Sequence, residues 1–157
     1  MDRLLKLLDT NARMTNAELA VMLGCTEQEV QHQITAWERA GVIRAYKAVI
    51  DWDRTDREYV TAIIELRVTP KRDYGFEKLA ETIMRFDEVE SIYLMSGGYD
   101  FAIFVSGRTF KEVAMFVAKR LSTLDSVIST ATHFVLRRYK ENNVLFLGEE
   151  KDERGAK

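Results

Sequence analysis

The sequence has 157 residues and a 46 % hydrophobic composition, which is enough to bury a core in one sizeable domain or two small ones. Its formal net charge of −2 gives no overall attraction to nucleic acid, so DNA binding would need a local basic surface. One cysteine and two histidines exclude an internal disulfide and the common zinc sites, so we expect no metal and no cofactor.

Residues 1–50 contain three successive helical patterns. Four leucines give residues 2–10 an apolar face. The runs Thr15-Asn16-Ala17-Glu18 and Thr26-Glu27-Gln28-Glu29 both have the form of a capping box. They predict helices over about 16–23 and from Thr26 to near Gly41, with Gly24 closing the first of them. Two capped helices around a short turn, preceded by a third helix, form a helix-turn-helix pattern.

Residues 42–58 separate this pattern from the rest of the chain. The run from Val42 to Ile50 is apolar and β-prone, and it is either an extended connector or the strand of a wing. The following residues 51–58 are mostly polar and form a linker. We therefore place a helix-turn-helix domain at 1–50 and the domain boundary in the linker.

From Tyr59 onward the pattern alternates between strands and helices. A strand is expected over 60–68, an amphipathic helix over 76–84, a hairpin around 93–104, a second helix over 110–124 and a long strand over 127–139. This order predicts a ferredoxin-like βαββαβ domain over 59–147, followed by a charged tail at 148–157. The fold class is α+β, a winged helix-turn-helix followed by this domain. Because its two helices cover one face of the sheet, the bare face predicts self-association.

The tip of the expected hairpin gathers polar groups around two glycines. Glycine enters positive φ without steric cost, so Gly97-Gly98 permits a tight reversal and a close approach. Ser96, Tyr99 and Asp100 add a hydroxyl, an amphipathic ring and a carboxylate, and with exposed backbone amides these groups suit a small zwitterion. The alternative is a hairpin with no ligand.

The last strand mixes hydroxyl and apolar side chains. Alternation places one set on a single face, and that set comprises Ile128, Thr130, Thr132, Phe134 and Leu136. Thr130 and Thr132 either support a ligand site or serve in cross-strand pairing, for which threonine is a favoured residue.

Taken together, these pieces resemble the Lrp/AsnC, or feast/famine, family of prokaryotic transcriptional regulators. The resemblance extends from about Leu4 to Tyr139. Its motifs here are Asn11-Ala12-Arg13, Glu18-Leu19-Ala20, Gly41-Val42-Ile43 with Tyr46, Ser96-Gly97-Gly98-Tyr99-Asp100, and Ser129-Thr130-Ala131-Thr132 with Val135-Leu136.

The resemblance implies a C-terminal domain, often called RAM, that dimerises through its sheets and assembles into octamers or larger discs. It also implies an amino-acid effector bound between dimers at the glycine tip and the last strand. The candidate contacts are then Ser96, Gly97, Gly98, Tyr99, Asp100, Thr130 and Thr132. Backbone amides at the tip would take the ligand carboxylate, and Asp100 would take its ammonium.

The third helix departs from the family pattern because it is acidic. Between Thr26 and Ala40 there are three acids and one base, and residues 1–53 hold eight acids and six bases. Phosphate neutralisation dominates DNA affinity, so these acids weaken it. The candidate DNA contacts are Glu27, Gln28, Gln31, His32, Thr35 and Arg39, of which Glu27 would accept from cytosine. The alternative is a solvated helix face without DNA contact.

Three functions therefore follow from the sequence. The first is a DNA-binding, amino-acid-sensing regulator, and the second is an effector-binding regulator that has lost DNA contact and acts through protein partners. The third is an enzyme, since siroheme decarboxylases resemble this architecture; the chain has no Ser/His/Asp set, phosphate loop or metal cluster, so we expect no enzyme. No apolar run approaches the roughly 20 residues of a membrane span and no signal peptide opens the sequence, so we expect a cytoplasmic protein.

Overall fold

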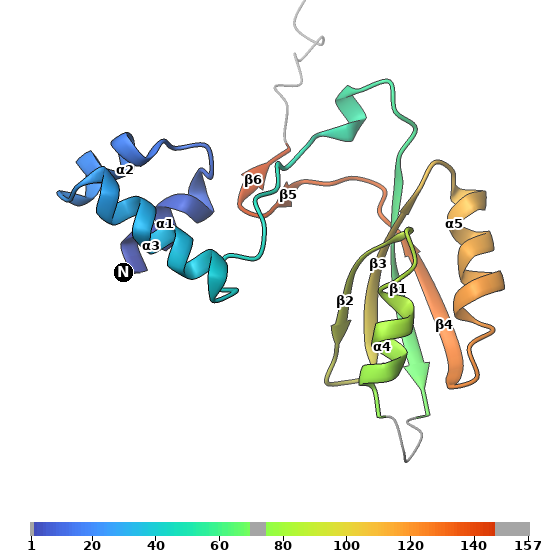
Figure 1. Ribbon diagram of the computed structural model, residues 1–157. Helices are drawn as coiled ribbons and strands as arrows, with labels where there is room; N and C mark the ends of the chain where they lie inside the picture. The colour runs from blue at the N-terminus through green and yellow to red at the C-terminus, as the bar shows by residue number, and fades with distance from the viewer. Residues whose placement is uncertain (1, 70–74, 147–157) are drawn as a thin grey trace, which may run out of the picture. The chain divides into compact units, whose positions relative to one another are not determined.

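The computed structural model describes residues 2–69 and 75–146, and it divides into two compact units between Ala48 and Val49 (Figure 1). The tail expected at 148–157 lies outside the described residues. None of the helices in the described ranges is long and apolar enough to cross a membrane.

The first unit consists of three helices, α1 (Asp2–Thr10), α2 (Asn16–Leu23) and α3 (Glu27–Arg39). Both capping boxes are formed as the sequence predicts. The Thr15 and Thr26 hydroxyls accept from the backbone N–H groups of Glu18 and Glu29 at 3.2 Å, and the glutamates accept from the threonine N–H groups in return. The helices enclose a small apolar core made of Leu4, Leu8, Leu19, Ala20, Val30 and Ile34.

Gly24 makes the turn between α2 and α3 possible. Its φ of 69° lies in the left-handed region, which glycine enters at little cost. Its N–H donates to the Ala20 carbonyl at 2.9 Å. The turn to the N-cap Thr26 is therefore short, as the helix-turn-helix pattern requires.

Residues 42–50 form an extended connector. Of the two alternatives for this run, the wing strand is not formed: no strand is assigned between the end of α3 and β1, a stretch that the structure describes in full. A strand needs a hydrogen-bonding neighbour, and the pairings of the first unit provide none here. The N–H groups of Val42 and Ile43 instead donate to the Trp37 carbonyl.

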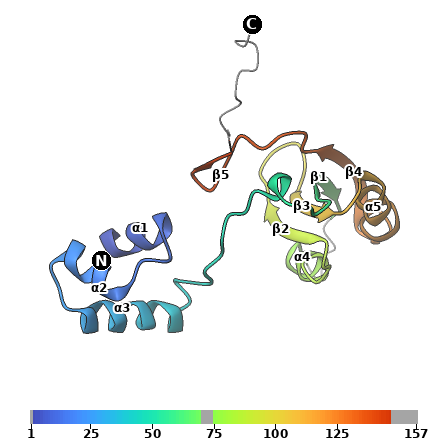
Figure 2. The same cartoon turned by 90° about the horizontal axis from the view of Figure 1, so that it is seen from above.

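The second unit has the predicted βαββαβ order. Its elements are β1 (Val60–Val68), α4 (Glu77–Ile83), β2 (Val89–Leu94), β3 (Phe101–Gly107), α5 (Phe110–Phe116) with a final π-helical turn η2 (Val117–Leu121), and β4 (Val127–Phe134). All pairings in the sheet are antiparallel, in the order β2-β3-β1-β4. Figure 2 shows the sheet from above, with α4 and α5 on the same side of it.

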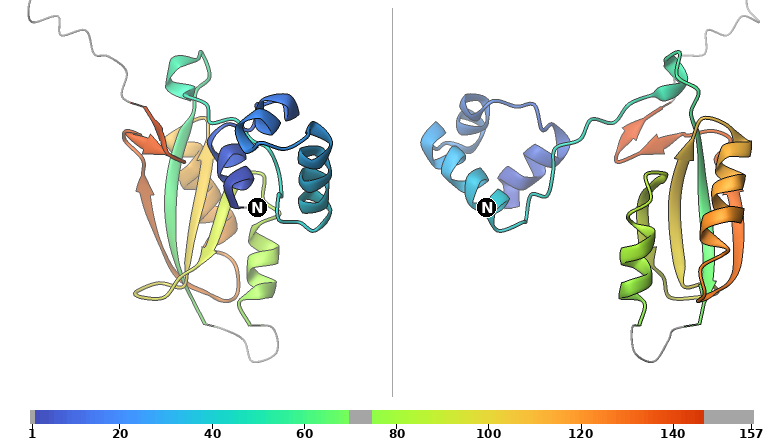
Figure 3. Two further views of the ribbon diagram at one scale, coloured as in Figure 1. Left: turned by 90° about the vertical axis from the view of Figure 1, so that its left-hand side faces the viewer. Right: turned by 45° about the vertical axis from the view of Figure 1, so that its right-hand side comes forward.

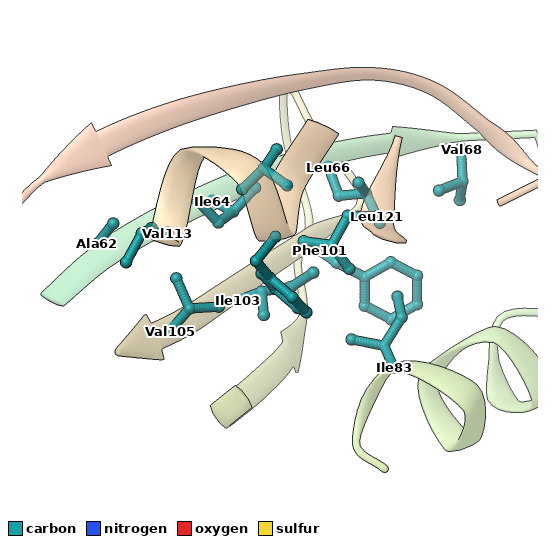
Figure 4. Close-up of a cluster of buried hydrophobic side chains, with 12 residues drawn as sticks. Ala62, Ile64, Leu66, Val68, Ile83, Phe101, Ile103, Val105, Val113 and Leu121 are labelled. Atoms are coloured by element: carbon teal, nitrogen blue, oxygen red, sulfur yellow. The ribbon is translucent and has the colours of Figure 1, made fainter. Parts of the chain in front are cut away.

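The core of this unit lies between the sheet and the two helices. Alternate residues of β1 and β3 point into it and meet Ile83 of α4, Val113 of α5 and Leu121 of η2 (Figure 4). The strand residues are Ala62, Ile64, Leu66, Val68, Phe101, Ile103 and Val105. No helix among the described residues of this unit covers the opposite face of the sheet.

The prediction of one long final strand over 127–139 is wrong in two respects. β4 ends at Phe134 rather than Tyr139, and the chain then forms a separate hairpin of β5 (Lys140–Glu141) and β6 (Val144–Leu145), outside the main sheet (Figures 1 and 3). Its loop residues Asn142 and Asn143 have φ values of 46° and 63°, which is the geometry of a two-residue hairpin turn. The asparagine pair is a signal for a turn that the sequence reasoning overlooked.

A bulge also changes the alternation in β4. Arg67 pairs with Ser129 and Val68 with Val127, so Ile128 is the extra residue and has no partner. Ile128 is 66 % exposed. The simple alternation predicted that it shares the face of Thr130 and Phe134, and this prediction is wrong.

Candidate functional sites

The surface of α3 carries the polar residues predicted to read DNA. Val30 and Ile34 face the core, whereas Glu27, Gln28, Gln31, His32 and Arg39 are exposed and Thr35 is half-buried. They fall in two neighbouring rows with a spacing of four residues, 27/31/35/39 and 28/32, so they share one broad face of the helix. The Gln31 amide donates to the Thr35 hydroxyl at 3.1 Å, which orders part of that face.

Two of the three acids of α3 have structural partners. The Glu29 carboxylate accepts from the Thr26 backbone at 2.8 Å, and this bond holds the pKa of Glu29 below its usual value. Glu38 accepts from the Tyr46 hydroxyl at 3.0 Å; burial, together with this bond, raises the pKa of Tyr46. The acidity of α3 is therefore explained in part by the helix cap and by the attachment of the connector.

The tip between β2 and β3 is open to solvent. Ser96, Gly97 and Gly98 are exposed, and Tyr99 is half-buried. Gly97 has a φ of 144°, which L side chains rarely adopt. A Cβ added to Gly97 or Gly98 would meet no atom within 4 Å. The backbone of the tip is therefore accessible to a ligand or to another chain.

Asp100 ties this tip to the central strand. Its carboxylate oxygen Oδ2 accepts the Val68 N–H at 2.7 Å, and its own N–H donates to the Leu66 carbonyl at 2.9 Å. The Met95 N–H donates to the Asp100 carbonyl at 2.8 Å and closes the loop. Asp100 thus already has a structural role, which the sequence reasoning did not include.

Thr130 and Thr132 lie on β4, two strands away from β3. Leu66 of β1 pairs with Phe101 on one side and with Thr130 on the other, so the backbones of Phe101 and Thr130 are roughly 10 Å apart. The hydroxyls of Thr130 and Ser122 are 3.4 Å apart, which places the Thr130 side chain toward the helix layer. The tip residues form one loop, and the threonines form a separate group beside it.

The uncovered face of the sheet is partly apolar. Tyr93 and Phe104 make an edge-to-face contact with ring centroids 5.9 Å apart, and their side chains remain 54 % and 38 % exposed. Ile63 pairs with Phe104, and the Glu65 carboxylate lies 3.4 Å from the His133 imidazole. Aromatic residues are enriched in the cores of protein interfaces, whose rims are polar.

The linker is anchored to the second unit by an aromatic and charged group of residues, of which the sequence indicated Trp52 but not Arg57, Tyr59 or Glu90. The rings of Trp52 and Tyr59 lie 5.6 Å apart, and the Arg57 guanidinium lies 4.6 Å above the Trp52 ring. The Tyr59 hydroxyl donates to the Glu90 carboxylate. Burial, followed by this bond, raises the pKa of Tyr59 to about 12. The spacing of aromatic and basic residues in 52–59 was the available signal.

Comparison with known proteins supports both units. A family model described as the Lrp/AsnC ligand binding domain matches residues 61–145. The chain is 47 % identical over 152 residues to the HTH-type transcriptional regulator YugG of Bacillus subtilis (strain 168), covering 96 % of this chain and 92 % of that protein. It is 29 % identical over 141 residues to the proline dehydrogenase transcriptional activator of Rhodobacter capsulatus, covering 90 % and 91 % respectively.

A solved structure has the same fold as this chain. The transcriptional regulator NMB0573 of Neisseria meningitidis, solved in complex with L-Met, superposes with a TM-score of 0.73 and covers 88 % of both chains. The two sequences are 23 % identical, so this likeness concerns the fold alone.

Proposed function

The chain belongs to the Lrp/AsnC family of HTH-type transcriptional regulators, and on that premise we propose that α3 binds double-stranded DNA while the tip of the β2–β3 hairpin senses an amino acid. The single observation that carries the proposal is the pairing of a capped helix-turn-helix with a separate unit that matches the family's ligand-binding domain. The relatives are named as transcriptional regulators, which favours a regulator over an enzyme.

The DNA contact is proposed for the exposed face of α3. Glutamine side chains make paired hydrogen bonds to adenine, and a carboxylate accepts from cytosine. Gln28, Gln31 and His32 are exposed and Thr35 is half-buried beside Gln31, with Glu27 at the start of the helix and Arg39 at its end. Arg39 is the cation of this helix that would neutralise a phosphate.

The ligand is proposed to be a free amino acid held at the tip. The exposed backbone of Ser96, Gly97 and Gly98 would donate to the ligand carboxylate, and the Asp100 carboxylate would attract its ammonium. Tyr99 supplies an apolar wall with a hydroxyl, and Thr130 and Thr132 would support the site from β4. The complex of a structural relative with L-Met makes methionine a reasonable first probe.

The assembly is proposed to be a homodimer that associates further into an octamer or a larger ring. The uncovered sheet face around Tyr93 and Phe104 is the surface proposed for the dimer, because it presents exposed aromatic rings on a flat sheet. We place the protein in the cytoplasm, where a DNA-binding regulator meets its operator. Effector binding would then change either the number of subunits in the assembly or the spacing of the helix-turn-helix units. Either change would alter the affinity for DNA.

Fluorescence anisotropy tests the DNA-binding part directly. The protein is titrated into a labelled duplex from its own upstream region and into a scrambled duplex of equal length, at low and at physiological salt. We expect preferential binding to the upstream duplex that weakens as salt rises. Equal or absent binding by a folded oligomer at both salt concentrations would contradict a DNA-reading α3.

The second candidate is a regulator that binds an effector but acts through protein partners. The acidity of α3, with three acids and one base from Thr26 to Ala40, is the observation in its favour. To separate this candidate from the DNA-binding regulator, a panel of free amino acids is tested, with L-methionine first. Calorimetry measures the binding, and light scattering measures the size of the assembly. A ligand response without any DNA binding would support this candidate.

A further inference from the structure

The C-terminal hairpin of β5 and β6 needs an anchor. Each of its strands has two residues, and an isolated two-stranded hairpin is marginally stable in water. Within the described residues, its backbone contacts are the short β5–β6 pairing and the Phe146 N–H bond to the Tyr139 carbonyl at 3.0 Å. Side-chain contacts add to these in fixing the position of the hairpin.

Arg138 provides that anchor at the entrance to the hairpin. Its guanidinium lies 2.9 Å from the Glu141 carboxylate and 5.0 Å from the centre of the Phe146 ring. These contacts hold both arms of the hairpin, because Glu141 belongs to β5 and Phe146 follows β6. The Arg138 side chain is 21 % exposed and that of Glu141 is 45 % exposed, so the guanidinium is shielded from water whereas the carboxylate remains open to water and salt.

The same guanidinium also contacts the end of the connector, next to the linker. Its Nη1 donates to the Ile50 carbonyl at 3.5 Å, at the point where the chain enters the second unit. Its positive charge also acts on the Tyr59 hydroxyl, where it opposes the rise in the pKa of that group. Tyr59 is in turn bonded to Glu90 of β2, and its ring makes a tilted contact with that of Trp52. Arg138 thus bonds the hairpin to Ile50 on one side of the linker, and its charge acts on Tyr59 on the other side.

We propose that Arg138 and the β5–β6 hairpin form a clasp that fixes the path of residues 49–59 on the ligand-binding unit. Arginine suits this position because its planar guanidinium presents five donors and can bond and stack simultaneously, whereas lysine makes one compact point contact. The clasp limits the directions in which the connector leaves this unit. Opening it would give the DNA-binding unit greater freedom, which would lower its affinity for paired half-sites.

The regulatory part of this inference rests on the DNA-binding role proposed above, whereas the clasp is tested without DNA. Hydrogen–deuterium exchange is measured on the full chain for the wild type, Arg138→Ala, Arg138→Lys and a control, Lys119→Ala. Lys119 lies in η2, is exposed, and its removal deletes one cation from the same unit. Gel filtration confirms that all four proteins are compared in the same assembly.

We expect Arg138→Ala to accelerate exchange in residues 49–59 and 138–146 by roughly tenfold, the size associated with losing a hydrogen bond to a charged group. Exchange in β1 and β3 should not change. Arg138→Lys should give a smaller acceleration in the same segments, and Lys119→Ala should match the wild type.

Wild-type exchange in residues 49–59 of both Arg138 variants would overturn the clasp. Acceleration spread evenly over the whole unit would also overturn it, since Arg138 would then be a general stabiliser. If Arg138→Ala does not fold, Arg138→Lys decides between the same two outcomes. A wild-type protein that binds no DNA leaves this result intact, so failure of the clasp and failure of the DNA-binding proposal are distinguishable.

Discussion

The Asp100 carboxylate and the Val68 backbone N–H form a 2.7 Å hydrogen bond that joins the glycine tip to the end of the central strand. The carboxylate serves the Val68 N–H as acceptor in place of a backbone carbonyl. Val68 also lies where the pairing of β1 with β4 shifts its register, between Arg67 and Val68. Asp100 therefore holds the loop that precedes it, and the same carboxylate is the group proposed to attract a ligand ammonium.

Two substitutions of Asp100 separate these roles. Asp100→Ala leaves the Val68 N–H without its acceptor, which should cost about 1–3 kcal/mol in local stability and weaken amino-acid binding by about tenfold or more. Asp100→Asn keeps an acceptor for Val68 but removes the charge, so the tip should remain ordered while ligand affinity falls. Calorimetry reports the affinity, and exchange of the Val68 amide reports the order. Unchanged affinity in both variants would remove Asp100 from the ligand site.

The exposed acid at the start of α3 should repel DNA phosphates. We expect Glu27→Gln to strengthen binding to a scrambled duplex by roughly threefold at low salt, and by less at high salt, because charge repulsion is screened. Glu81→Gln, on α4 of the other unit, is the matched control and should have no effect. Anisotropy titrations measure both. Weaker binding to the upstream duplex alone would show that Glu27 also reads a base, as proposed above, whereas unchanged binding to the scrambled duplex would contradict the repulsion.

The uncovered sheet face should be essential for self-association. Phe104→Arg places a charge among the exposed rings and should weaken the dimer by about 30-fold or more, since an unmatched charge in an interface costs ~2 kcal/mol or more. Met84→Arg is the control, because Met84 on the helix side is 53 % exposed. Light scattering over a dilution series gives the mass of each protein. An unchanged mass for Phe104→Arg would move the interface elsewhere.

Tyr59 should titrate later than an ordinary tyrosine. Its pKa is raised from 10.0 to about 12, so folding favours the neutral phenol. The stabilising contribution is complete below pH 10 and is lost as the pH rises toward about 12. Ultraviolet titration should show a component near pH 12 that Tyr59→Phe removes and Tyr139→Phe retains. A titration curve that Tyr59→Phe does not alter would contradict the assigned environment.

Local signals were sufficient to predict the helices of the first unit. The capping boxes at Thr15 and Thr26 are contained in four residues each, and both are formed. The βαββαβ order followed from the change in hydrophobic period, and it is also confirmed. These features depend on residues close together in sequence, for which propensity and capping rules apply.

Features that depend on distant pairings were not predictable in the same way. The bulge at Ile128 keeps β4 in register with β1 on both sides of the shift after Arg67. The residues of β4 alone contain no pattern that predicts it. The second role of Asp100 requires Val68, which is far away in the sequence. The alternation rule placed Thr130 and Thr132 on one face. The pairing of these residues with the buried Leu66 and Ile64 of β1, together with the contact between Ser122 and Thr130, identifies that face as the helix-covered one.

The position of β1 in the centre of the sheet has a consequence for the order of folding during synthesis. β1 pairs with β3 and with β4, and β4 is the last strand of the sheet to leave the ribosome. The three-helix unit, in contrast, is a compact unit within the first 48 residues, all of which are made before β1. The DNA-binding unit can therefore fold on the nascent chain while the ligand-binding sheet still lacks an edge. A chain truncated before β4 would retain a helix-turn-helix without a completed sensor.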